Sequence, residues 1–74
     1  MTVTVKLFAT FRTGRFNSEV RDYTPGTVVR TVLDELNLPL DDIGAILING
    51  RHVEEDAALQ EGDMLSIFPL VGGG

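Results

Sequence analysis

The feature that most constrains how this chain can fold is a single segment with helical periodicity. The segments on both sides of it alternate as β-strands do. The apolar residues recur at helical spacing at five positions: Val28, Val29, Val32, Leu33 and Leu36. Thr27 is expected to be the N-cap, and we expect the helix to end near Asn37 because Pro39 follows. A single helix of this length has to cover the apolar face of a sheet.

Five segments have the composition or alternation of strands: residues 2–11, 19–23, 45–48, 51–53 and 64–68. The first places Val3, Val5, Leu7, Ala9 and Phe11 on one face. Asn49-Gly50 predicts a type I′ hairpin turn, and the charged run 54–56 is interpreted as a solvated loop. This order predicts an α+β fold of the β-grasp class.

In the expected β-grasp fold, a mixed sheet of four to five strands packs on one main helix. The first and last long strands are expected to be parallel neighbours, joined by a handed crossover. We expect residues 1–71 to form the β-grasp domain and residues 72–74 a flexible glycine tail.

Composition excludes several classes of function. The chain has 74 residues, no cysteine and one histidine, so thiolate chemistry, iron–sulfur ligation and a multi-histidine metal site are not expected. A domain this small leaves little area for a deep catalytic cavity, so we expect no enzyme, no bound cofactor and no metal. Eleven acidic against six basic residues argue against nucleic acid or an anionic membrane and favour a basic protein partner. With no long apolar segment or signal peptide, the expected location is the cytoplasm.

Two aromatic residues interrupt the polar faces of their strands. Phe8 follows Thr4 and Lys6, and Phe68 is in line with Met64 and Ser66. If the first and last strands are neighbours, both rings lie on the solvent side of the sheet, with Met64 beside them. Taken singly, each ring could be an ordinary surface aromatic. Together, next to the glycine tail, they predict a partner-docking surface.

The tail Gly72-Gly73-Gly74 has no side chains and could thread a narrow channel to present a terminal carboxylate. Glycine-rich ends are also often only disordered. His52, the other candidate site residue, has no nucleophile or orienting partner near it in sequence, so a surface histidine beside a turn is the simpler interpretation.

Several short motifs together resemble the MoaD/ThiS family of ubiquitin-like sulfur carriers, and in particular the small subunit of molybdopterin synthase. The motifs are residues 5–9 (Val-Lys-Leu-Phe-Ala), Gly26-Thr27-Val28, Asn49-Gly50, Glu61-Gly62-Asp63, Phe68-Pro69 and the terminal Gly73-Gly74. They occur in the order and at the spacing of that family over essentially the whole chain.

The resemblance implies that an E1-like enzyme of the MoeB/ThiF type adenylates the Gly74 carboxylate with ATP. A sulfur donor protein then converts the carboxylate to a thiocarboxylate. In the molybdopterin branch, Gly73 and Gly74 insert into a large catalytic subunit of the MoaE type and give sulfur to a pterin precursor. Gly72 makes the glycine ending triple where the family has a double glycine, and we expect it to extend the inserted tail. The resemblance also implies partner-binding roles for Phe8 and Phe68. Met64, which belongs to the same predicted apolar patch, and His52, which stands where the docking face of related small subunits is often apolar, are the other expected partner-binding residues.

Three alternatives remain at this stage. The chain could carry sulfur for another pathway, such as thiamine synthesis or tRNA thiolation. It could be a protein modifier conjugated to lysine through Gly74, or a non-covalent ubiquitin-like interaction module.

Overall fold

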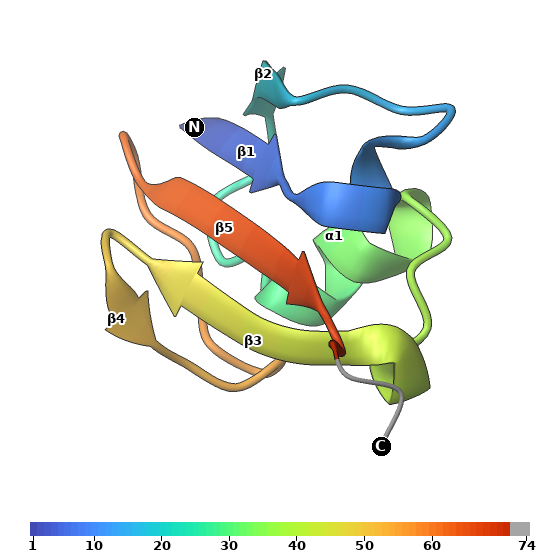
Figure 1. The fold of residues 1–74 in the computed structure, drawn as a ribbon. Helices are drawn as coiled ribbons and strands as arrows, with labels where there is room; N and C mark the ends of the chain where they lie inside the picture. The colour runs from blue at the N-terminus through green and yellow to red at the C-terminus, as the bar shows by residue number, and fades with distance from the viewer. Residues whose placement is uncertain (72–74) are drawn as a thin grey trace.

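The structure is a computed structural model that describes residues 1–71, in which a five-stranded sheet packs against one α-helix (Figure 1). The elements in chain order are β1 (Thr2–Leu7), the 3-10 helix η1 (Ala9–Arg12), β2 (Ser18–Asp22), α1 (Val29–Glu35), the 3-10 helix η2 (Leu40–Asp42), β3 (Ile43–Ile48), β4 (Arg51–His52) and β5 (Met64–Pro69). The strand order is β2-β1-β5-β3-β4. This arrangement confirms the predicted β-grasp class.

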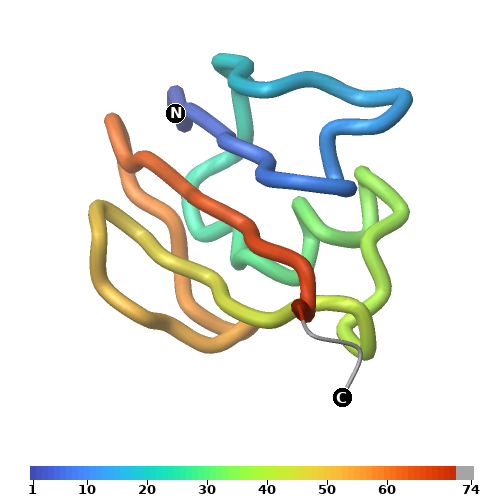
Figure 2. The backbone as a smooth tube through the Cα atoms, in the orientation of Figure 1, coloured from blue at the N-terminus to red at the C-terminus, as the bar shows by residue number. Residues whose placement is uncertain are grey.

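The last strand runs through the centre of the sheet. β5 pairs in parallel with β1 and antiparallel with β3, and Figure 2 shows it running between these two strands. The parallel pairing of the first and last strands is therefore confirmed. β2 and β4 form the two edges, each antiparallel to its neighbour.

The core lies between the sheet and α1. Alternate residues of β1 and β5 point toward the helix, which buries its own apolar stripe against them. The buried residues are Val3, Val5, Leu7, Phe11, Val29, Val32, Leu33, Leu38, Ile46, Leu59, Leu65 and Ile67. The opposite face of the sheet is left uncovered by any other element of residues 1–71, and this outward face holds the candidate site (Figure 1).

The first strand is shorter than the alternation predicts. β1 ends at Leu7, and the chain then turns at Ala9, whose φ is 51°, into η1. Ala9 is exposed rather than inward, so its predicted position was wrong. Phe11 does reach the core, but it does so from the 3-10 helix. Phe11 continues the apolar alternation in the sequence although the strand ends at Leu7.

The predicted N-cap of the helix was also wrong by one residue. Val28 occupies the cap position, and the Thr27 hydroxyl donates instead to the carbonyl of Thr24 at 2.7 Å. The amides at the start of α1 are satisfied by backbone: Val29 N donates to Ala57 O and Arg30 N to Glu55 O. Because a loop distant in sequence supplies these acceptors, no side-chain cap is needed.

The two predicted turns are confirmed. Asn37, with φ 58°, ends the helical segment, as its tolerance of left-handed angles predicted. Asn49 and Gly50 have φ 52° and 83°, the signs that a type I′ turn requires. The charged run 54–56 is a loop rather than a helix, as interpreted from its sequence.

Candidate functional site

Phe8 and Phe68 meet on the outward face of the sheet. Their ring centroids are 4.1 Å apart and their planes are inclined by 11°, so the two rings are stacked. Both side chains are only partly buried. The structure thus brings together the two aromatic residues that the sequence placed on the solvent side, one from the end of β1 and one from the end of β5.

The backbone register arranges the outward residues in rows that cross the sheet. One row passes from Ser18 through Lys6, Ser66 and Leu47 to His52, and spans all five strands. The next row toward the end of β5 pairs Phe68 with Ala45. The row on the other side joins Val20, Thr4 and Met64.

This register separates the predicted partner-binding residues. Met64 is on the same face as Phe68 and is 41% exposed, but the row of Ser66 lies between them. Met64 is therefore not in contact range of the aromatic stack along the strand. His52 is exposed on β4 and pairs with Leu47.

An open groove of about 480 Å³ lies beside Phe68, between the end of β5 and β3. Its lining residues are Gly44, Ala45, Leu47, His52, Phe68, Pro69, Leu70 and Val71. Most of these side chains are apolar. The groove therefore brings His52 and Phe68 to one concave surface next to the last described residues of the chain.

The end of β5 is fixed against the start of β3 by backbone contacts. The Leu70 amide donates to the Asp42 carbonyl at 2.9 Å. A Cβ atom added at Gly44 would lie 2.7 Å from the Pro69 carbonyl oxygen, so only glycine permits this approach without displacement. The register between β3 and β5 shifts at this point, between Ile43 and Ala45. Gly44 thus permits the close approach of the two backbones at the end of β5.

Arg12 adds a positive charge next to the aromatic stack. Its Nε donates to the Leu7 carbonyl at 2.8 Å, and its guanidinium carbon lies 5.4 Å from the centroid of Phe8. This distance is within the range of a cation–π interaction. The Leu7 carbonyl and the Phe8 ring together orient Arg12 at the edge of the candidate site.

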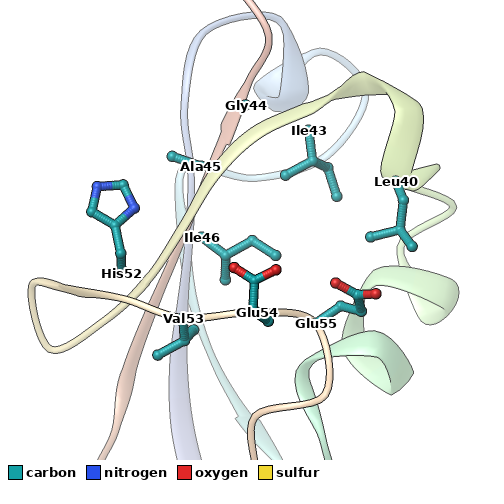
Figure 3. A pocket seen from close by; sticks show the side chains of 9 residues that line it. All are labelled: Leu40, Ile43, Gly44, Ala45, Ile46, His52, Val53, Glu54 and Glu55. Carbon is teal, nitrogen blue, oxygen red and sulfur yellow. The ribbon is translucent and has the colours of Figure 1, made fainter.

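A second hollow, of about 370 Å³, lies next to β3 and the loop after β4. Figure 3 shows Ala45 and His52 on one side of β3, and the carboxylates of Glu54 and Glu55 on the other. His52, Glu54 and Glu55 all line this hollow. Glu55 pairs with Arg30 at 3.3 Å, and no group of three or more metal-binding side chains occurs among residues 1–71.

Comparison with known protein families gives one match. The sequence profile of the ThiS family matches residues 5–74, which is nearly the whole chain. The chain belongs to the ThiS family. No curated protein matches the ThiS-family chain.

Solved structures of similar proteins share the fold of this ThiS-family chain. A protein of Pyrococcus furiosus, assigned as subunit 1 of molybdopterin converting factor, is 30% identical, with 96% of this chain and 99% of that chain covered and a TM-score of 0.77. SAMP1 of Haloferax volcanii, the structure of a small archaeal modifier protein, is 27% identical over the full length of both chains, with a TM-score of 0.77.

A third similar structure is a complex. A chain in the complex of subunits 1 and 2 of molybdopterin-converting factor from Helicobacter pylori 26695 is 26% identical to this ThiS-family chain. Both chains are covered completely, and the TM-score is 0.69. The ThiS-family chain therefore resembles both ubiquitin-fold sulfur-carrier subunits and a protein modifier.

Sequence reasoning missed two residues of the candidate site in the ThiS-family chain, Gly44 and Arg12. A glycine directly before the apolar run 45–48 could have indicated a close approach of another backbone segment. Arg12 had no such signal, because its contact with Phe8 depends on the turn at Ala9.

The predicted reactive residue of the ThiS-family chain, Gly74, and the predicted insertion residues Gly72 and Gly73 lie outside the described residues. Their roles remain predictions. Within residues 1–71, no helix is long and apolar enough to cross a bilayer.

Proposed function

We propose that this ThiS-family chain carries sulfur on Gly74 for the synthesis of molybdopterin, the organic part of the molybdenum or tungsten cofactor. The single observation that carries the proposal is the position of the chain's exit from the sheet. β5 leaves the sheet directly beside the stack of Phe8 and Phe68, so a partner that docks on the stack receives the glycines that follow Val71.

The proposed chemistry activates the carboxylate before sulfur is added. A carboxylate, whose pKa is about 3.5, is ionised at neutral pH and is a poor electrophile. In the activating enzyme, a Gly74 oxygen attacks the α-phosphorus of ATP and pyrophosphate leaves. Sulfide (HS⁻) then attacks the acyl carbon, AMP leaves with the C–O bond electrons and the S–H proton is lost to water, so that one carboxylate oxygen is replaced by sulfur; the donor protein has to release its sulfur as sulfide for this step.

In this proposal the chain itself is a cosubstrate, and catalysis occurs in its partners. The expected partners are an E1-like adenylating enzyme, a sulfur donor protein and a large catalytic subunit of molybdopterin synthase, with the cytoplasm as the place of reaction. The similarity to a subunit that is found in complex with subunit 2 in Helicobacter pylori supports the last of these.

A reconstituted reaction tests the proposal. The chain is incubated with the E1-like enzyme of its own genome, ATP and sulfide, and its intact mass is measured. We expect a sulfur-for-oxygen exchange at the C-terminal residue, and we expect subsequent sulfur transfer when the large synthase subunit and its pterin precursor are added. A matched variant with one residue appended after Gly74 should show neither. Sulfur transfer by the appended variant would reject the assignment of the Gly74 carboxylate.

The second candidate function is protein modification, favoured by the similarity to SAMP1. Here a lysine amine attacks the activated Gly74 acyl group and forms an isopeptide bond. Mass spectrometry of proteins from native cells separates the two functions. Free chains with sulfur in place of oxygen support the carrier, whereas branched lysine peptides as the only product support the modifier.

A non-covalent interaction module is the remaining alternative. In that case neither sulfur exchange nor branched peptides should form, and deletion of Gly73-Gly74 should leave partner binding and every cellular function intact. The carrier function predicts instead that this deletion abolishes sulfur transfer without unfolding the domain.

A further inference from the structure

The outward face of the sheet around the end of β5 has a charge opposite to that of the molecule. The chain has eleven acidic residues and a net charge of -5, and all eleven acids lie within residues 1–71. None of them occupies an outward position in the three rows that pass through Thr4, Lys6 and Phe68. We call these three rows the docking face.

The acidic residues lie elsewhere for structural reasons. Two of them are on α1, and the runs 41–42 and 54–56 follow the helix or the short strand β4. Asp63, directly before β5, is engaged by Asn49 Nδ2 at 3.0 Å and by the Gln60 amide at 2.8 Å. Asp22 is outward but pairs with Thr2, one row beyond the docking face.

Two permanent positive charges lie on or beside the docking face. Lys6, the only lysine of the chain, points outward in the row that spans all five strands. Arg12 lies against Phe8. The ion pairs found within residues 1–71 involve Arg21 and Arg30, so neither Lys6 nor Arg12 has an acidic partner in this part of the chain.

We propose that the docking face binds an acidic surface of the activating enzyme, in which carboxylates surround an apolar pocket for Phe8 and Phe68. The inference rests on the proposed function only in taking an E1-like enzyme as the partner. Docking would remove water from Lys6, and a cation that loses its hydration needs a carboxylate partner to offset the cost. The net charge of the chain had indicated a basic partner, but the charge of the contact surface determines local complementarity.

The test compares two charge reversals that change the net charge equally. Lys6→Glu places an acid on the docking face. Arg51→Glu is the matched control, because Arg51 pairs with the inward residue Ile48, has no ion pair within residues 1–71, and faces away from the docking face. Association with the E1-like enzyme of the same genome is measured by stopped flow at several salt concentrations. Thermal unfolding confirms that each variant is folded.

We expect Lys6→Glu to slow association on the order of tenfold at low salt and to reduce its salt dependence. Arg51→Glu should bind nearly as the unchanged protein does. If long-range attraction to a basic partner dominated, both variants would associate faster, and the inference would be overturned. Equal binding by Lys6→Glu and the unchanged protein would overturn it too. Lys6→Gln, which removes the charge with little risk to folding, should give an intermediate rate.

Failure of this inference and failure of the proposed function are distinguishable. Both a sulfur carrier and a protein modifier must bind the activating enzyme, so the binding test does not depend on the pathway. Binding without sulfur exchange at Gly74 would reject the proposed function and leave the docking inference intact. An unchanged protein that does not bind the activating enzyme would overturn the inference, since the face would then lack its proposed occupant.

Discussion

Phe8 and Phe68, near opposite ends of the chain, stack with their centroids 4.1 Å apart on the uncovered face of the sheet. The parallel pairing of β1 with β5 makes this contact possible, because it brings the ends of the two strands to the same edge. The rings are only partly buried in the free protein. They therefore retain apolar surface that a partner can cover.

Replacing either ring by alanine should weaken partner binding more than folding. Loss of the stack removes about 1 kcal/mol of stability, since the contact that is lost joins two partly buried rings. Truncating an aromatic residue that is a hot spot of an interface costs about 2 kcal/mol or more of binding free energy. Calorimetric titration with the activating enzyme and chemical unfolding of Phe8→Ala and Phe68→Ala measure the two losses. Unfolding of both variants under native conditions would show that the rings belong to the core.

Gly44→Ala should destabilise the protein by about 1–3 kcal/mol, because overpacking against a backbone atom forces the chain to move. The new Cβ would meet the Pro69 carbonyl oxygen at 2.7 Å and the Leu70 Cα at 3.1 Å. The hydrogen bond from the Leu70 amide to Asp42 should weaken as a result. Urea unfolding measures the stability, and hydrogen exchange of the Leu70 amide reports the local effect. Unchanged exchange and stability would contradict the close approach.

Arg15→Ala should destabilise the protein by about 1–2 kcal/mol, because it leaves several carbonyls without their donor. The guanidinium binds the carbonyls of Phe11, Leu36 and Asn37 at 3.2, 3.1 and 3.4 Å, and so joins η1 to the end of α1. Arg51→Ala is the control, since this exposed side chain has no hydrogen bond within residues 1–71. The unfolding temperature of Arg15→Ala should be clearly lower than that of Arg51→Ala. Equal effects would mean that the three contacts contribute nothing.

Tyr23 should make stability depend on pH in the alkaline range. The pKa of Tyr23 is raised from 10.0 to about 12. Partial burial of the phenol is the larger cause, and the hydrogen bond to Glu35 is the next. The neutral phenol is therefore favoured in the folded state. Its contribution to stability is complete below pH 10, the pKa of the unfolded chain, and is lost as the pH rises toward 12.

The chain has one tyrosine and no tryptophan, so an ultraviolet titration reports Tyr23 alone. We expect the pKa of Tyr23 to be higher in the folded protein than in the protein unfolded by denaturant. Tyr23→Phe should flatten the decline in stability between pH 10 and about pH 12, which are the unfolded and folded pKa values of Tyr23. The same decline in Tyr23→Phe as in the unchanged protein would assign it to other groups.

Much of the fold could be predicted because its signals are local. Asn37 and Asn49-Gly50 favour particular backbone angles wherever they occur, and the structure has those angles at these residues. Alternation identified the segments of β1 and β5. The outward position of Phe8 and Phe68 followed from that alternation once the strands were taken as neighbours.

Other features could not be predicted because they depend on residues far apart in sequence. The end of β1 at Leu7 was missed, since Phe11 continues the apolar alternation although η1 carries it into the core. The cap of α1 was missed because carbonyls of the loop 54–57 bind its first amides.

The sequence by itself determined the order of the elements, the one-sided apolar core and the ThiS-family character of the chain, because periodicity and turn residues act over a few positions. Only the tertiary structure decided which residues share the docking face. Cross-strand hydrogen bonds fix the register that joins Lys6 to Ser66 and Leu47 to His52, and a shift of one residue would turn each side chain to the other face. The separation of Lys6 and Arg12 from the acidic residues is a consequence of that register and of the turn at Ala9.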